Sequence, residues 1–193
     1  MDHPATTPPL TTRSYAYAPP AFDSAAAMTM SGLDYMIALA AGRIGALPSI
    51  SSTIGMSPPV DLSHGRAAVE AEAVDFLLNP MGAVHGGFAA TMLDTAMGIA
   101  VHTTLPTATG YTTVELKINY TRAILPANGL LRAEGWVVHQ GRQMATAEGR
   151  LTGVADGRLY AHGSTTCFIF PLKPRSAQES EQGADTARAA HGA

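Results

Sequence analysis

The sequence predicts an α+β fold in which one long apolar helix packs against a curved antiparallel sheet. Residues 87–103 have the length of a helix and carry large apolar side chains on every side, which is typical of a helix buried all round. The segments that follow alternate as strands do and are separated by turn signals. A chain of 193 residues with 46% hydrophobic residues is long enough to enclose such a helix in one domain.

The expected strands lie on both sides of this helix in the sequence. One strand is expected before it, in residues 65–74. After it, apolar and polar side chains alternate, and turn signals such as Asp156-Gly157 follow at intervals. We expect the strands after the helix to form an antiparallel meander over 112–120, 130–139, 142–154 and 158–170. A short amphipathic helix is expected from Leu33 to about Gly45.

The ends of the chain differ in composition from its middle. Residues 1–30 are rich in Pro, Thr and Ala and are predicted to be a flexible arm. Residues 31–172 are predicted to be the folded domain, and the polar residues 173–193 a disordered tail. The chain has one cysteine, Cys167, and no uninterrupted apolar run near the length of a membrane span. We therefore expect a cytoplasmic protein with no membrane contact.

Charge and residue spacing argue against two classes of partner. The net charge is -3, and the Lys and Arg residues are scattered, so nucleic acid is not an expected partner. The histidines are dispersed and no Cys/His spacing fits a metal, so no metal site is expected.

Charged residues make up only 14% of the chain, which indicates that further copies of the chain cover part of the surface.

Asp94 is the only Asp, Glu, Lys or Arg between Phe76 and Val114, and it lies in the apolar helix. We expect it to lie well inside the fold, where an ionised carboxylate is costly unless it is hydrogen-bonded or serves a purpose. One interpretation is a general base. The alternative is a structural carboxylate that anchors a neighbouring loop through backbone N–H groups.

His85-Gly86-Gly87 stands where this helix should begin. Unpaired N–H groups and the positive end of the helix dipole make such a site suitable for an oxyanion or a polarised carbonyl. The alternative is that the two glycines only permit tight packing. Both interpretations remain open on the tripeptide alone.

The spacing between these two features constrains how they could act together. Asp94 lies eight residues beyond Gly86, so the two are about 12 Å apart along one helix. A base and an oxyanion donor must each lie about 3 Å from the reacting atoms. If both act, the site is shared between two antiparallel copies of the helix, and the protein is at least a dimer.

These residues resemble a known family. The pattern resembles the hotdog-fold acyl-CoA thioesterases of the PaaI-like group, which includes the second type of 4-hydroxybenzoyl-CoA thioesterase, over about residues 32–172. It is carried by Asn79, His85-Gly86-Gly87, Leu93-Asp94, Thr113-Val114-Glu115-Leu116 and Asn119-Tyr120. The resemblance implies a hotdog fold and hydrolysis of an aromatic or short- to medium-chain acyl-coenzyme A. It implies a dimer or a tetramer of two dimers, and no cofactor, because coenzyme A is part of the substrate.

The resemblance also implies roles for individual residues. Asp94 would activate water as a general base or attack as a nucleophile that forms a mixed anhydride. Gly86 and Gly87 of the partner subunit would polarise the thioester oxygen, and Asn79 would hold the carbonyl or the water. Thr113 would orient the water beside Asp94. His85 would fix the loop rather than transfer protons.

Coenzyme A also needs groups that bind its phosphates. The candidates are Arg142, His139, Gly141 and Arg122. The alternative for each is a turn residue or a solvated charge.

Two positions depart from the expected pattern. Alternation places Thr113 on the polar face with Glu115 and Lys117, so its role requires a twist or a bulge at the start of the strand, or a surface buried by the partner subunit. Gly98 stands where the hydroxybenzoyl branch carries a hydroxyl residue, which argues against that substrate.

Two other functions are kept beside the thioesterase: a hotdog hydratase or dehydratase acting on a hydroxyacyl thioester, and a non-catalytic acyl-CoA sensor.

Overall fold

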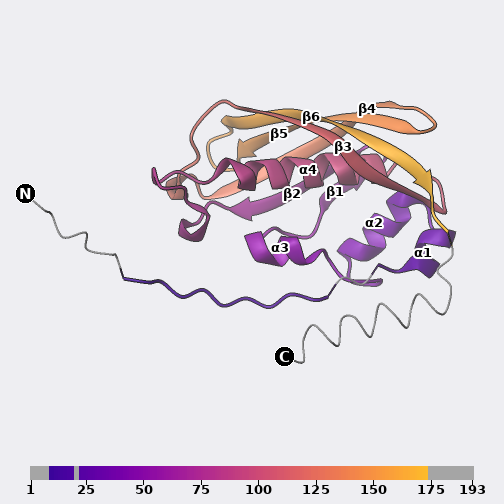
Figure 1. Ribbon diagram of the computed structural model, residues 1–193, viewed down its shortest axis with the longest axis horizontal. Coiled ribbons are helices and arrows are strands. Elements are labelled where there is room, and N and C mark those ends of the chain that lie inside the picture. The colour runs from indigo at the N-terminus through magenta and orange to yellow at the C-terminus, as the bar shows by residue number, and fades with distance from the viewer. Residues whose placement is uncertain (1–8, 20–21, 174–193) are drawn as a thin grey trace, which may run out of the picture.

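The computed structural model describes residues 9–19 and 22–173 (Figure 1). The long helix α4 (Gly86–His102) lies along the concave side of a six-stranded antiparallel sheet. The predicted α+β hotdog arrangement is confirmed. The strands are β1 (Val60–Ser63), β2 (Arg66–Glu72), β3 (Thr109–Tyr120), β4 (Leu130–Gln140), β5 (Met144–Gly153) and β6 (Leu159–Pro171).

The order of strands across the sheet is β1-β2-β4-β5-β6-β3, so the predicted meander of four strands is wrong in one respect. Of the four described strands after α4, β4, β5 and β6 follow one another as neighbours, whereas β3 pairs with β6 and β4 pairs with β2. The turn signals at Pro126 and Asn128-Gly129 belong to a crossing connection that contains a short 3₁₀ helix, η2 (Pro126–Asn128), instead of a hairpin. As a result β3 is an edge strand.

Small residues allow α4 to lie close to the sheet. Leu93, Met97 and Val101 of α4 have no exposed surface, as expected for a helix that is apolar on every side. At Gly135 of β4, a Cβ atom would lie 2.5 Å from the backbone carbonyl of Ala96, so the helix and the strand are in direct contact there. The position of α4 against the sheet therefore depends on the absence of a side chain at Gly135.

Three short helices, α1 (Ser24–Thr29), α2 (Gly32–Ala40) and α3 (Ser49–Ile54), lie on the side of α4 opposite the sheet (Figure 1). The helix predicted from Leu33 is confirmed and ends at Ala40, before Gly42 adopts a positive φ. α1 occupies the end of the segment for which the sequence predicts a flexible arm. The Asp23 carboxylate caps it by accepting from the Ala26 N–H at 2.9 Å, and Ala27 is buried.

The predicted tail lies outside the described residues, apart from Lys173. Within residues 9–19 and 22–173, no helix is both long and apolar enough to cross a bilayer.

The close contact at Gly135 leads to a stability prediction. Gly135→Ala should lower the free energy of unfolding by about 3 kcal/mol or more, because the added methyl meets backbone that cannot move away as a side chain could. Val138→Ala, at an exposed position of the same strand, should change it by less than about 0.5 kcal/mol. Urea denaturation of both variants measures the difference, and equal midpoints would contradict this account of the packing.

Candidate active site

A hydrogen bond joins the middle of α4 to the edge strand. The Thr113 hydroxyl of β3 donates to Asp94 Oδ1 of α4 at 3.0 Å. Both residues are half-buried, so Asp94 is less enclosed than the sequence predicts. The reason is that the sheet covers one side of α4, while the side that carries Asp94 faces an open cavity.

A bulge in β3 brings Thr113 to this position. The register between β3 and β6 shifts between Thr113 and Glu115, and the extra residue, Val114, is 56% exposed. One extra residue inverts the alternation, so Thr113 lies on the same face as Ile118, which packs against the core. The bulge, one of the arrangements that the strand pattern left open, is present.

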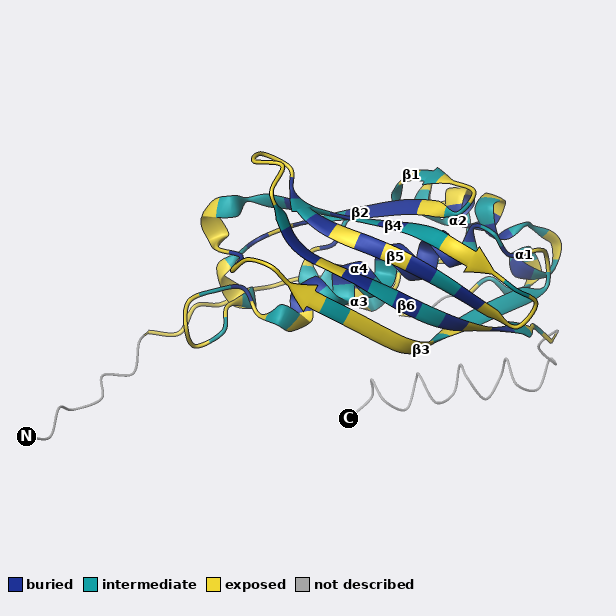
Figure 2. Cartoon of the chain, turned by 90° about the horizontal axis from the view of Figure 1, so that it is seen from above, coloured by how far each residue is buried: buried dark blue, intermediate teal, exposed yellow. Residues whose placement is uncertain are grey.

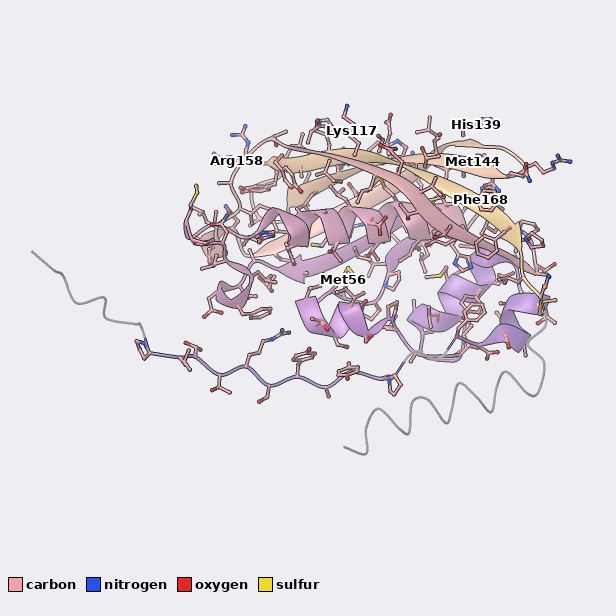
Figure 3. The ribbon with its side chains drawn as sticks, viewed as in Figure 1. Met56, Lys117, His139, Met144, Arg158 and Phe168 are labelled. Atoms are coloured by element: carbon pink, nitrogen blue, oxygen red, sulfur yellow. The ribbon has the colours of Figure 1, made fainter. Side chains whose placement is uncertain are left out.

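Asp94 and Thr113 line a cavity of about 380 Å³ between α4 and the helices α2 and α3. Figure 1 shows α2 beneath the C-terminal half of α4 and α3 nearer its N-terminal half. The walls are mostly apolar, and Met56, labelled in Figure 3, comes from the segment that joins α3 to β1. Apolar cavities with few polar groups are typical of binding sites for small molecules. No sequence pattern predicted this cavity, because its walls come from distant segments.

His85 caps the N-terminus of α4. Its Nδ1 atom accepts a hydrogen bond from the Gly87 N–H at 2.9 Å, which uses one of the donors that the sequence offered for an oxyanion. The Gly86 N–H has no hydrogen-bond partner among the described residues. Of the two glycines predicted to polarise a carbonyl, only Gly86 has an unused N–H, because an N-cap side chain bonds inside the first turn.

Gly86 is also packed against the end of β3. The Tyr120 hydroxyl donates to the Gly86 carbonyl at 3.1 Å, and a Cβ atom on Gly86 would lie 3.1 Å from the Tyr120 ring. A glycine at this position lets the tyrosine approach the start of the helix.

Asn79 lies in a tight loop at the same end of α4. Its Oδ1 atom accepts from the N–H groups of Met81 at 2.9 Å and Ala83 at 3.3 Å, so this oxygen holds the loop together. The loop is tied to the helix by the His85 N–H, which donates to the Leu77 carbonyl at 2.8 Å. Only the side-chain NH₂ of Asn79 is left to donate to a ligand.

One chain does not bring all the predicted site residues together. Gly86 and Asp94 remain eight residues and about 12 Å apart on one helix. Arg122 follows the end of β3, whereas Arg142 and Gly141 line a separate cavity beside Thr109, at the start of the same strand. The two ends of β3 are roughly 35 Å apart. His139 lies near Gly141, at the end of the sheet that also carries Met144 and Phe168 (Figure 3).

His102 lines the cavity and has no role in the sequence prediction. Its ring stacks on Tyr35, with centroids 5.5 Å apart, and meets the Tyr111 ring edge-on at 5.6 Å. Burial lowers the pKa of His102 to about 4, so it is neutral at pH 7. The sequence feature that could have identified His102 as a cavity residue is its position eight residues after Asp94, on the same face of α4.

The chain matches the model of the thioesterase superfamily over residues 81–159. It is 30% identical over 118 residues to a "putative esterase" of Caenorhabditis elegans, a match that covers 60% of this chain and 68% of that protein. The chain belongs to the thioesterase superfamily. A "putative esterase" of Halobacterium salinarum is 43% identical over 77 residues, or 39% of this chain, and the match spans about half (49%) of that relative.

Solved structures agree with this assignment. A phenylacetic acid degradation-related protein of Ralstonia eutropha, described as a "putative thioesterase", is 28% identical with a TM-score of 0.63; the match covers 69% of this chain and 98% of that one. A Streptococcus mutans protein solved with acetyl-CoA bound is 26% identical with a TM-score of 0.54; the match covers 60% of this chain and 90% of that one.

The cap at the start of α4 can be tested separately from catalysis. His85→Ala should lower the free energy of unfolding by about 1 kcal/mol, because the Gly87 N–H loses its acceptor, and His85→Asn should restore it. Denaturation measures the stability, and thiol release from an acyl-CoA measures the activity. A fall in kcat of about 100-fold or more in a stable His85→Asn variant would show that the imidazole transfers protons, contrary to its position as a cap.

Proposed function

We propose that the protein hydrolyses the thioester of an acyl-coenzyme A to the free acid and coenzyme A, in a site shared between two subunits. The observation that carries this proposal is the Asp94–Thr113 hydrogen bond at the wall of an apolar cavity. This arrangement places the Asp94 carboxylate beside a cavity whose apolar walls suit an acyl group. Membership of the thioesterase superfamily supports the reaction, and the acetyl-CoA in the S. mutans structure supports the substrate class.

In the proposed mechanism, Asp94 is the general base. It takes a proton from water as the water oxygen attacks the thioester carbonyl. Thr113 holds Oδ1, and among the described residues it is the only side chain that donates to Asp94, so Oδ2 is left to accept from the water. When the tetrahedral intermediate collapses, the C–S bond breaks and the coenzyme A thiolate takes the proton back from Asp94.

The oxygen of this intermediate needs a hydrogen-bond donor that the same chain does not place near Asp94. We assign this role to the N–H of Gly86 of the partner subunit, because the Gly86 N–H has no partner among the described residues of its own chain. The NH₂ group of Asn79 lies at the same helix end and is assigned to hold the carbonyl or the water.

The surface of the chain supports such a dimer. If Gly86 of each chain meets Asp94 of the other, the two α4 helices are antiparallel and the twofold axis passes near position 90, midway between them. The residues of α4 around that position that the chain leaves partly or fully exposed are small, apart from Asp94: Gly86, Gly87, Ala90 and Thr91. Small side chains let two helices approach closely.

The edge of the sheet points to the same surface. β3 lies at one edge of the sheet, and Figure 2 shows that most of this strand is exposed. Its exposed side chains include Val114, Leu116 and Tyr120. An edge strand with exposed apolar residues is a site for pairing with another chain, and we assign it to the dimer interface.

The same symmetry gives a role to the cations that one chain keeps apart. In an antiparallel pair, Arg122 at the end of one β3 lies near the start of the partner strand, where Arg142, His139 and Gly141 are found. We propose that these residues bind the phosphates of coenzyme A. Pairing of two such dimers into a tetramer remains the expectation from the family resemblance.

The role of Asp94 is tested by isosteric variants. Asp94→Asn should lower kcat by about 10³-fold with little change in KM, because the amide fills the same space but accepts no proton. Thr113→Val should lower kcat by about 10-fold and Thr113→Ser should restore it, because the hydroxyl positions the carboxylate. Thiol release measured over short, medium, long and aromatic acyl-CoAs gives these values.

Other outcomes identify the alternatives. Full activity of a folded Asp94→Asn variant would overturn the mechanism. Loss of crotonyl-CoA absorbance without thiol release would indicate a hydratase, and saturable acyl-CoA binding without any turnover would indicate a sensor.

The shared site is tested by mixing two inactive variants. Gly86→Pro removes the N–H at the first helical position, where the helix backbone tolerates proline, and His85 already has the extended backbone that precedes a proline. The exposed Tyr120 ring has to turn aside to make room for the proline side chain. Gly86→Pro and Asp94→Asn should each be inactive alone. Unfolded and refolded together, they should recover about a quarter of wild-type activity, because about half of the dimers are mixed and each holds one intact site.

The control is a mixture of Asp94→Asn with Asp94→Ala, which holds no intact site in any combination. No recovery in the first mixture, or an active monomer in sedimentation, would overturn the shared site.

A further inference from the structure

Four aromatic residues separate two cavities. The 380 Å³ cavity beside Asp94 and a second one of about 270 Å³ are both lined by Phe22, Tyr35, His102 and Tyr111. The rings follow one another in contact: Phe22 and Tyr35 are 5.8 Å apart between centroids, Tyr35 and His102 are 5.5 Å apart, and His102 and Tyr111 are 5.6 Å apart. These residues, which we name the aromatic wall, close the far end of the first cavity.

The distance from Asp94 to this wall follows from helix geometry. Asp94, Gly98 and His102 lie at successive intervals of four residues on one face of α4, so His102 is about 12 Å from Asp94 along the axis. Tyr111 leans on the helix between them, because a Cβ atom at Gly98 would lie only 2.7 Å from the Tyr111 hydroxyl. Asp94 and His102 both line the cavity, so it extends along α4 between them, with Tyr111 of the aromatic wall along its side and Tyr35 and His102 at the end away from the carboxylate.

The lining suits a long apolar chain. Met36, Leu39, Val69 and Ile99 are among the side chains that face the cavity. Among the described residues, Asp94 and His102 are the only acidic or basic side chains in its lining. His102 is neutral at pH 7, because its pKa is lowered to about 4, so no charge at the far end would attract a carboxylate on the acyl tail.

We propose that this cavity holds the straight acyl chain of a medium-length substrate and that the aromatic wall sets its maximum length. A carbon chain advances about 1.25 Å per bond, given 1.5 Å bonds at near-tetrahedral angles, so 12 Å accommodates roughly eight to ten carbons from the carbonyl. A single aromatic ring next to the carbonyl would fill only the end near Asp94 and leave the rest of the cavity without contacts. The assignment of the carbonyl end rests on the proposed function, whereas the apolar chamber does not.

Two substitutions should shift chain-length preference in opposite directions. Tyr35→Ala removes part of the aromatic wall and joins the two cavities, so the preferred chain should lengthen by about four carbons or more. Ile99→Trp fills the chamber between Asp94 and His102, so the preferred chain should shorten to about six carbons or fewer. Ile37→Ala is the matched control, because Ile37 is exposed on the same helix as Tyr35 and does not line the cavity.

The experiment has two readouts on the full chain. The first is the kcat/KM for thiol release from straight-chain acyl-CoAs of increasing length, in which the wild type should be best near eight to ten carbons and about 10-fold or more worse at sixteen. The second is the binding of the free straight-chain acids, followed by thermal shift, which requires no hydrolysis. Phe22→Ala is a second variant of the wall for the case in which Tyr35→Ala does not fold, because Phe22 is half exposed.

The outcomes separate this inference from the proposed function. Length-dependent binding of the acids without any thiol release would support the chamber and reject the thioesterase. Thiol release with no dependence on chain length, or an unchanged length profile in both wall variants, would overturn the chamber and leave the reaction standing.

Discussion

The rise of an α-helix, about 1.5 Å per residue, is the constraint on which the rest of the site depends. Gly86, Asp94 and His102 are spaced eight residues apart on α4. The unused N–H of Gly86 is therefore about 12 Å from the Asp94 carboxylate along the helix, and that carboxylate is about 12 Å from His102 at the end of the cavity. The first distance is too long for one chain to bring donor and carboxylate to one carbonyl. The second distance is long enough for an extended acyl chain.

Three parts of the α4 surface face different surroundings. The sheet covers one side along its length, with Gly135 allowing direct contact between the backbones. Residues of the chain's own α2 and α3 line the apolar chamber together with Ile99 and His102 of the C-terminal half. The N-terminal half, from Gly86 to Asp94, keeps exposed positions. This difference between the two halves explains how α4 can be apolar on every side and still leave the Asp94 carboxylate accessible. The exposed N-terminal half is the part that we assign to the contact with the partner subunit.

The bulge in β3 shows how a local irregularity serves the site. Regular alternation would have placed Thr113 on the outer face with Glu115, away from Asp94. One extra residue, Val114, moves Thr113 to the inner face, and β3 stays paired with β6 on both sides of the bulge with its register shifted by one residue. Because β3 is an edge strand, the irregularity disrupts only one ladder.

The sequence by itself determined the local structure and the chemistry. Periodicity predicted α4 and most of the strands, because side-chain pattern reflects which face is buried. The alternation around Thr113 indicated a bulge, a twist or a surface covered by the partner. The lone carboxylate and the glycines at a helix start marked the site. The eight-residue spacing predicted that one chain could not complete it.

Only the tertiary structure decided the contacts between distant segments. Sequence patterns do not specify which strands pair, so the place of β3 beside β6 was not predicted. The cap that occupies the Gly87 N–H depends on the rotamer of His85, and the aromatic wall joins residues from Phe22 to Tyr111. Contacts of this kind depend on packing in three dimensions, which no local pattern records.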